Sequence, residues 1–233
     1  MPCADYSKRA RYHPPSPKVR RTGAARYAVC MFSRFLDFLF PPRTDEALVR
    51  GISETDFLAL LDPRPASETN AVALLPYRDP RVRAVIHEAK YRGSERAFVL
   101  LAAALTDYLA DPDVGRQTSH MRLVPVPLGA KRRQERGYNQ AEEIARRAGG
   151  ALGIEILPDA LRRTRETASQ VSLPRAARLE NMRGAFGAAH SLDPTYLYIV
   201  IDDVVTTGAT LSAATDALQH AGAENVLALA LAH

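Results

Sequence analysis

The sequence has few of the residues that build metal and disulfide sites. It contains only two cysteines, Cys3 and Cys30, among 233 residues. Four ligands for a structural zinc ion therefore cannot be assembled, and the six histidines show no ligand spacing that could supply them. The chain also lacks an apolar run long enough to cross a membrane. These absences exclude a zinc site held by the protein and a membrane span, and we expect a cytoplasmic location.

A large excess of positive charge is absent from most of the chain, although the isoelectric point is about 9.4. Seven of the 31 Lys and Arg residues, but only Asp5 of the 26 acidic residues, fall within residues 1–30. The rest of the chain therefore carries 24 basic and 25 acidic residues. Because affinity for nucleic acid depends largely on phosphate contacts, this near-neutral remainder argues against strong autonomous DNA binding.

Residues 1–30 are predicted to be a disordered basic tail, because they combine this charge with prolines at positions 14, 15 and 17. They lack the long apolar core of a secretory signal. Two other interpretations stay open, namely an organellar targeting segment and a natural start at Met31. The apolar residues that follow, within 32–42, share a helical face, and we expect this segment to dock on the folded domain.

Two common phosphate-binding motifs are also missing. The Walker motif requires a lysine after its last glycine, and no lysine follows Gly208. The dinucleotide-binding motif needs three glycines, whereas this stretch has one. The sequence has instead a buried-strand pattern over Leu197–Ile201, followed directly by Asp202 and Asp203.

A short loop and a helical pattern come after the two acids. The loop residues are Thr206, Thr207, Gly208, Ala209 and Thr210. Unpaired backbone N–H groups, hydroxyls and the helix dipole all favour a phosphate at such a position. The two carboxylates suit sugar hydroxyls or a hydrated Mg²⁺. The alternative is that the acids merely end a strand and a threonine caps a helix.

Two further segments are rich in arginine. Residues 131–136 follow a short strand with alternating prolines and include Arg132 and Arg136, which suit a pyrophosphate group. A solvated basic loop and a nucleic-acid patch are the alternatives. Residues 162–183 form a long polar stretch that we interpret as a lid, with Gln170 and Arg178 as candidate contacts on closure. The alternative is a helix with an exposed basic face.

Four segments carry a resemblance to known proteins. Residues 199–210, IVIDDVVTTGAT, resemble the phosphoribosyl pyrophosphate (PRPP) binding motif of type I phosphoribosyltransferases. Residues 85–93, with the sequence KYRG at their end, resemble a signature of the competence protein F (ComF) family. Residues 123–140 and 178–186 resemble two further blocks of that family. The matches lie in the same order as in the family and extend over residues 81–233.

The resemblance implies a role for each segment. Asp202 and Asp203 would hold the ribose hydroxyls, and residues 206–210 would hold the 5′-phosphate. Residues 131–136 would hold the pyrophosphate, with Mg²⁺ as the cofactor, bound through PRPP and to the two acids as a second option. Residues 162–183 would be the flexible loop that closes over PRPP and excludes water.

The sequence departs from the family at its N-terminus. Typical members have zinc-ribbon cysteines after Pro-Pro-Arg, whereas this chain continues from Arg43 with Thr44 and Asp45. We therefore expect residues 31–75 to form a small helical module in place of a zinc ribbon. Residues 76–233 are expected to form an α/β domain with a mainly parallel central sheet. The periodicity predicts helices near 81–91, 95–110, 139–150 and 210–221, and strands near 122–126, 154–157, 197–201 and 225–231.

The expected function is that of an enzyme that transfers phosphoribosyl from Mg-PRPP to an unidentified nitrogen nucleophile and releases pyrophosphate. The alternative is a non-catalytic PRPP-binding regulator, or a competence factor that interacts with single-stranded DNA or with DNA-uptake proteins. We leave a homodimer open.

Overall fold

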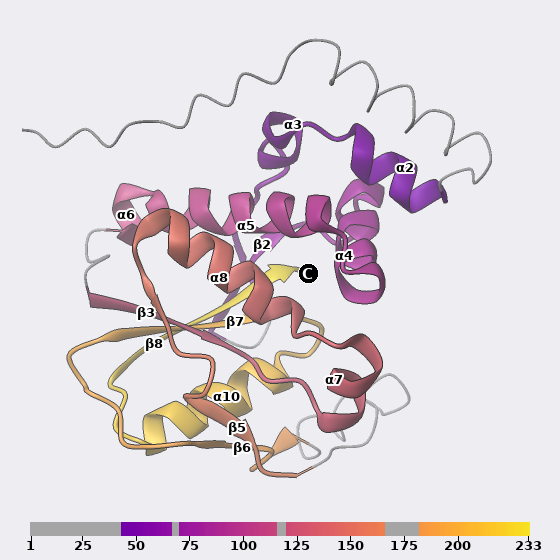
Figure 1. Cartoon of the computed structure of the whole chain (residues 1–233). Coiled ribbons are helices and arrows are strands. Elements are labelled where there is room, and N and C mark those ends of the chain that lie inside the picture. The colour runs from indigo at the N-terminus through magenta and orange to yellow at the C-terminus, as the bar shows by residue number, and fades with distance from the viewer. Residues whose placement is uncertain (1–42, 67–69, 116–119, 166–181) are drawn as a thin grey trace, which may run out of the picture. The chain divides into compact units, whose positions relative to one another are not determined.

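The structure is a computed structural model that describes residues 43–66, 70–115, 120–165 and 182–233. Its centre is a six-stranded sheet that lies between helices (Figure 1). Its strand order is β1-β2-β8-β7-β3-β4. The strands are β1 (Arg64–Pro65), β2 (Ala71–Leu75), β3 (Met121–Pro125), β4 (Glu155–Ile156), β7 (Leu197–Val204) and β8 (Asn225–Ala232). Only the edge strand β1 pairs in the antiparallel sense; the other neighbours are parallel. The expected α/β class with a mainly parallel sheet is confirmed.

Two layers cover the sheet. Five helices lie on one face: α2 (Thr44–Gly51), α3 (Glu54–Leu58), α4 (Pro80–Arg92), α5 (Glu95–Ala110) and α8 (Gln140–Leu152). The other face carries α10 (Ala209–His220) and a hairpin of β5 (Leu161–Arg163) and β6 (Phe186–Ala188). Two short helices, α6 (Pro112–Gly115) and α7 (Ala130–Arg136), lie in connections. The four helices and four strands expected from periodicity are therefore present, within a few residues of their expected ends.

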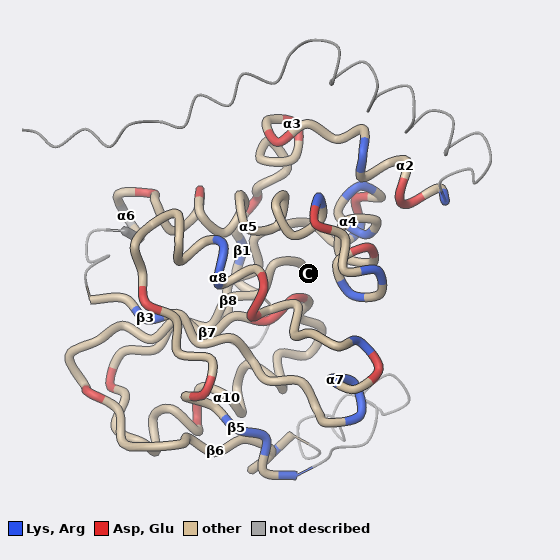
Figure 2. The backbone as a smooth tube through the Cα atoms, viewed as in Figure 1, with Lys and Arg blue, Asp and Glu red and all other residues tan. Residues whose placement is uncertain are grey.

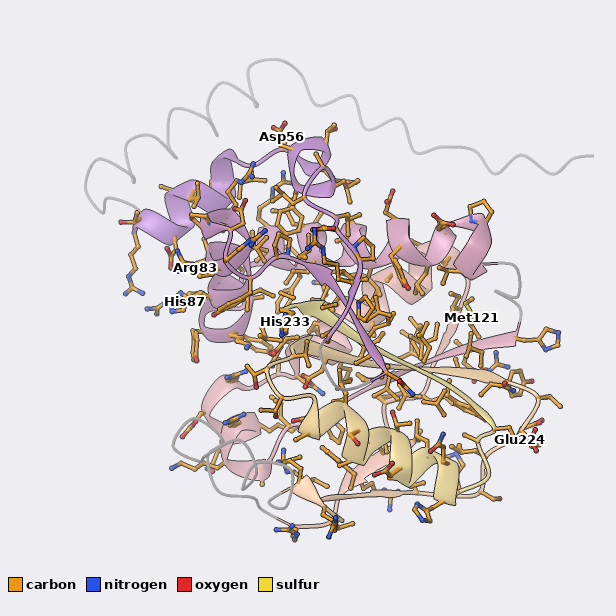
Figure 3. All side chains as sticks on the ribbon, turned by 180° about the vertical axis from the view of Figure 1, so that it is seen from behind. Asp56, Arg83, His87, Met121, Glu224 and His233 are labelled. Carbon is orange, nitrogen blue, oxygen red and sulfur yellow. The ribbon has the colours of Figure 1, made fainter. Side chains whose placement is uncertain are left out.

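Side chains of β7 alternate between these two layers, because successive residues of a strand point to opposite faces of a sheet. Ile199 and Ile201 belong to the core that includes α4, α5 and α8. Tyr198 and Val200 belong to the core that includes α10 and the hairpin. Seen from behind, Met121 and Glu224 lie at the amino ends of their strands, whereas His233 follows the carboxyl end of β8 on the side of α4 (Figure 3). The carboxyl ends of the parallel strands therefore meet beside the end of α4.

The boundary expected between residues 75 and 76 falls between strand β2 and helix α4. Strand β2 lies before this boundary, yet it pairs with β8 inside the central sheet. Helix α2 packs on α4, and the Arg96 guanidinium donates a 2.6 Å hydrogen bond to the carbonyl of Ile52. Residues 43–233 consequently form one compact unit. The expected tail and the docking segment within 32–42 lie outside the described residues.

The structure corrects the local form of residues 131–136, whose sequence and family resemblance predict a pyrophosphate-binding loop. They belong to helix α7, which has no buried residue. The helix ends at Gly137, whose φ of 78° lies in the left-handed region that favours glycine. Among the described residues, no helix has both the length and the apolarity needed to cross a membrane.

Candidate functional site

The two acids of the predicted site occupy successive positions near the end of β7 and therefore face different layers. Asp203 continues the row of Ile199 and Ile201 toward α4 and α8, and Asp202 continues the row of Tyr198 and Val200. Ala230 of β8 pairs with Asp202, and β3 ends beside Ile201. The acid pair therefore lies at the carboxyl edge of the sheet, where ligands bind in open α/β folds.

Asp203 is held by side chains from two helices. Its Oδ1 forms a 2.9 Å ion pair with the Nζ of Lys90, near the end of α4. Its Oδ2 accepts a short hydrogen bond from the side-chain amide of Gln140, the first residue of α8. The residue is only 7% exposed. Because both oxygens have partners within the protein, Asp203 is fixed in orientation before any ligand arrives.

Helix α8 begins at this point because Asn139 joins it to β3. The side-chain oxygen of Asn139 accepts a hydrogen bond from the N–H of Ala141, which is an N-cap interaction. Its amide nitrogen donates 3.0 Å to the carbonyl of Val126, just beyond β3. The first turn of α8, including Gln140, is therefore fixed beside the carboxyl end of β3.

Tyr138 joins the same turn to the end of α4. Its hydroxyl donates a 2.7 Å hydrogen bond to the carbonyl of Ala89. Gly93 ends α4 with a φ of 61°, and a Cβ at this glycine would lie 3.3 Å from the Tyr138 ring. These contacts dock the KYRG segment on residues 137–140, so that Lys90 and Gln140 reach Asp203 from neighbouring helices. The segments that carry the family resemblance thus meet at one carboxylate.

Asp202 has a different environment. It is partly exposed, and its Oδ1 accepts the backbone N–H of Asp203 at 2.8 Å. Burial and the adjacent Asp203 carboxylate raise the pKa of Asp202 to about 7, against smaller lowering effects of Lys90 and Arg163. Arg163 ends β5 on the hairpin, and its guanidinium carbon lies 5.4 Å from the centre of the Phe186 ring. The acid that faces the hairpin is therefore the one that titrates near neutral pH.

The predicted phosphate loop follows β7 directly and leads into α10. Gly208 precedes the helix with a φ of 74°, and its carbonyl accepts the N–H of Ser212. The hydroxyl of Thr207 accepts the N–H of Ala209 at 3.4 Å, whereas Thr206 is exposed. The first turn of α10, which contains Ala209 and Thr210, has no acidic residue. The positive end of the α10 dipole can therefore attract an anion at the edge of the sheet that carries the acids.

Helix α7 brings positive charge to the same edge, although in helical form. Arg136 donates a 2.9 Å hydrogen bond to the Oε1 of Gln140 and is thereby linked to Asp203 through one side chain. Its guanidinium carbon also lies 5.1 Å from the ring centre of Tyr91, which is 58% exposed. Arg132 is exposed one turn earlier. Figure 2 shows Lys and Arg gathered on α7 and at the nearby end of α4.

A protein-held magnesium ion does not fit the acid pair well. Among the residues that the structure describes, no group of three or more His, Cys, Asp or Glu side chains could hold a metal. Asp203 already pairs with a lysine, and an oxygen-rich octahedral shell would need several more ligands than Asp202 supplies. A magnesium ion at this edge would need its remaining ligands from a bound substrate or from water.

Some predicted contacts lie outside the site as described. Gln170 and Arg178 fall outside the described residues, so the expected lid has no structural account here. The clearest hollows are elsewhere, one over α3, α5 and α8 and one between β6 and α10.

Sequence reasoning missed three residues of this site. Lys90 and Gln140 were noticed only as letters of matched motifs, and Arg163 only as part of an arginine-rich stretch. Strand periodicity could have signalled that Asp202 and Asp203 face opposite layers. Nothing in the sequence indicated that α4 and α8 would supply the partners of Asp203.

Comparison with known proteins gives matches over much of the chain. No family model matches it. The chain is 34% identical over 131 residues to a protein named competence protein F from Haemophilus influenzae, a match that covers 54% of this chain and 57% of that protein. It is 32% identical over 165 residues to DNA utilization protein YhgH from Escherichia coli K12, covering 70% of this chain and 71% of that protein. Competence protein ComFC from Streptococcus pneumoniae matches over 110 residues at 34% identity, which is 47% of each chain. The chain thus spans less than two thirds of competence protein F and slightly more than two thirds of YhgH.

Proposed function

The chain belongs to the ComF family of competence and DNA utilization proteins, and from this premise we propose that it binds Mg-PRPP and transfers the phosphoribosyl group to a nitrogen nucleophile. The observation that carries the proposal is the edge formed by β7 and α10. A carboxylate pair, a glycine-containing loop and a helix N-terminus follow one another there within nine residues, from Asp202 to Thr210. These groups can bind a ribose that carries a 5′-phosphate, because carboxylates accept hydrogen bonds from hydroxyls and a helix N-terminus favours a phosphate.

Each group has a part in the proposed reaction. The loop of Thr206–Thr210 binds the 5′-phosphate through N–H groups and hydroxyls. The acid pair accepts hydrogen bonds from the ribose hydroxyls and stabilises the positive charge that develops on the sugar. Arg132 and Arg136 bind the pyrophosphate. The bond between the anomeric carbon and the pyrophosphate oxygen breaks as the bond to nitrogen forms, and pyrophosphate leaves with the electron pair.

Magnesium belongs to this proposal as a partner of the substrate. Mg²⁺ bound to PRPP would neutralise charge on the departing pyrophosphate. The acid pair offers it little, because Asp203 is engaged by Lys90 and Gln140. The protein's own contribution is to orient the ribose and to supply arginines beside the leaving group.

A second candidate function is a regulator or competence factor that binds PRPP without catalysis. The names of the relatives, which connect them with competence and DNA utilization, favour it. Contact with single-stranded DNA or with DNA-uptake proteins would belong to this function, as would a homodimer. The two candidates share the PRPP site and differ in whether pyrophosphate is released.

The double variant Asp202→Asn, Asp203→Asn tests the shared site. We expect it to lose measurable Mg-PRPP binding in isothermal titration calorimetry, because both sugar-facing charges are gone. Asp216→Asn is the matched control, since Asp216 is exposed on α10 beyond the phosphate loop. Thermal unfolding should show that both variants fold. Unchanged affinity in the folded double variant would remove the assignment.

A turnover screen separates the two candidate functions. The full chain is mixed with Mg-PRPP and a panel of nucleobases and amines, and pyrophosphate is measured. Release that depends on one acceptor supports the enzyme, and binding without release under every acceptor supports the regulator.

A further inference from the structure

The two acids of the candidate site differ in what they contact, and this difference rests on strand geometry. Asp203 faces α4 and α8 and has partners on both carboxylate oxygens. Asp202 faces the opposite layer, and among the described residues its carboxylate accepts a hydrogen bond only from the backbone N–H of Asp203. The residue Asp202 as a whole is also somewhat more exposed than Asp203. A pair that looks equivalent in sequence is therefore divided into one carboxylate with partners on both oxygens and one that can still accept further hydrogen bonds.

Lys90 is well placed to keep Asp203 engaged. Only 19% of its side chain is exposed, so its ammonium is held at the 2.9 Å contact with little competition from water. Helix α4 is locked at this end by the Tyr138 hydrogen bond to Ala89 and by the left-handed turn at Gly93. The second oxygen is held by Gln140, whose own carbonyl oxygen accepts from Arg136. Lys90 and Gln140 therefore hold Asp203 directly, and Arg136 in turn holds Gln140.

The position of the Lys90 ammonium also bears on metal binding. A divalent cation at Asp203 would have a positive charge as its immediate neighbour, in a partly dehydrated place where repulsion is strong. Mg²⁺ also requires near-octahedral oxygen coordination, and the described residues around the pair do not supply it. The carboxyl edge of the sheet is therefore better suited to a neutral diol, which can donate hydrogen bonds to the carboxylate of Asp202.

We propose that Asp203, held by Lys90 and Gln140, is a positioning residue, and that Asp202 is the carboxylate that contacts the ribose hydroxyls. The Lys90 ammonium also excludes a free divalent cation from the acid pair. The assignment to ribose rests on the proposed function, whereas the exclusion of the cation does not. Divalent cations then reach this edge only as complexes with the substrate.

The exclusion of metal can be measured without PRPP. Mn²⁺ alone is titrated with the full chain at pH 8, and free Mn²⁺ is followed by its electron paramagnetic resonance signal. The wild-type protein should leave the signal unchanged. Lys90→Met should bind Mn²⁺ weakly through Asp203, with water completing the coordination shell, and the double variant Lys90→Met, Asp203→Asn should lose this binding again. Lys90→Arg, which keeps the positive charge, should behave as the wild type.

Two results would overturn the exclusion. One is Mn²⁺ binding by the wild type that Asp203→Asn abolishes, and the other is no Mn²⁺ binding by a folded Lys90→Met protein. Because loss of Lys90 leaves a buried carboxylate without its partner, folding is checked by thermal unfolding. If the methionine variant does not fold, Lys90→Gln, which can still donate a hydrogen bond, takes its place.

The division between the acids is tested by single substitutions. Asp202→Asn should weaken Mg-PRPP binding by roughly ten-fold or more, in line with loss of a charged hydrogen-bond acceptor, and leave the melting temperature unchanged or raised. Asp203→Asn should lower the melting temperature, because Lys90 loses its ion pair. The reverse pattern would contradict the roles assigned here. If the wild type binds no Mg-PRPP at all, the proposed function fails, while the Mn²⁺ result still decides the role of Lys90.

Discussion

At the scale of single residues, the site depends on where each side chain points along β7. Asp202 and Asp203 are neighbours in the sequence but differ in their contacts. Asp203 contacts the side chains of Lys90 and Gln140, whereas Asp202 accepts a hydrogen bond from a backbone N–H. Proximity alone makes the pair unfavourable when both are ionised, because like charges repel. The structure relieves this repulsion by pairing Asp203 with a cation and by raising the pKa of Asp202 to about 7. Protonation of Asp202 is thus part of how the folded pair is tolerated.

This shift predicts a pH dependence of stability. The ordinary pKa of an aspartate is 3.8, and the folded value of Asp202 is about 7, so the folded state binds this proton more tightly. The resulting stabilisation is complete below pH 3.8 and is lost as the pH rises through 7. Asp202→Asn resembles the protonated form at every pH. We therefore expect its melting temperature to exceed that of the wild type by several degrees at pH 8 and to approach it at pH 5.

Melting curves between pH 5 and pH 8 provide this measurement. Asp216→Asn is the control, since its carboxylate is exposed, and its melting temperature should follow that of the wild type. Parallel curves for the wild type and Asp202→Asn would show that the proton on Asp202 does not contribute to stability.

At the scale of elements, the site depends on the junction of α4, α8 and the end of β3. The Tyr138 ring lies against Gly93 and meets Phe98 of α5 edge to face, with ring centres 5.6 Å apart. Asn139 then connects the start of α8 to Val126. Helix ends are ordinarily frayed, and these contacts fix two of them at the place where Lys90 and Gln140 must converge. Packing at the junction therefore sets the geometry of Asp203.

Two substitutions at this junction should lower the free energy of unfolding. Tyr138→Phe removes the hydrogen bond to Ala89 and should cost about 1 kcal/mol. Gly93→Ala forces a side chain into the left-handed region and should cost about 1–2 kcal/mol, with added strain from the 3.3 Å contact to the Tyr138 ring. Urea unfolding measures both values.

Gly150→Ala is the matched glycine control. Gly150 lies inside α8, and a Cβ there would meet nothing within 4 Å. This substitution should raise the free energy of unfolding by about 0.5–1 kcal/mol. A Gly93→Ala protein as stable as the Gly150→Ala protein would mean that the end of α4 is not constrained by Tyr138.

Elements with strong periodicity could be predicted from the sequence, and those without it could not. The sequence predicts β7 and β8 from their apolar runs, and α8 and α10 from their amphipathic faces. Burial of one face sets the spacing of apolar residues, so this spacing identifies each helix. Helix α7 has a charged or polar residue at six of its seven positions, and none is buried, so no period marks it. Strand β2 is a five-residue run that was assigned to the neighbouring module, because its partner β8 lies far away in the sequence. The contacts of Lys90 and Arg163 depend on this tertiary arrangement and have no local signal.

At the scale of the whole molecule, charge is distributed unevenly along the chain. Residues 1–30 carry seven of the basic residues, and the remainder has 24 basic and 25 acidic residues. Within the described part, basic residues gather on α7 and at the nearby end of α4 (Figure 2), and Arg136 of α7 is linked to Asp203 through Gln140. Many of the arginines elsewhere are paired, as Arg147 is with Glu95 and Glu143. The near-neutral remainder therefore offers a local anion site suited to a small phosphorylated ligand more than a continuous track for a nucleic acid.

This distribution predicts how binding of single-stranded DNA depends on the N-terminal residues. In the full chain, the seven basic residues of positions 1–30 can each displace counterions, so the logarithm of affinity should fall with the logarithm of salt concentration at a slope of up to about −5. A shortened chain that begins at Met31 should bind weakly at 150 mM salt and show a slope near −1 or smaller in magnitude, from the few exposed arginines of α7. Fluorescence anisotropy with a labelled oligonucleotide over 50–300 mM salt measures both slopes.

The variant Arg132→Gln, Arg133→Gln in the shortened chain is the control for α7, since both side chains are exposed. A steep slope in the shortened chain that this variant removes would show that α7 binds DNA by itself, and would favour the competence factor over the transferase.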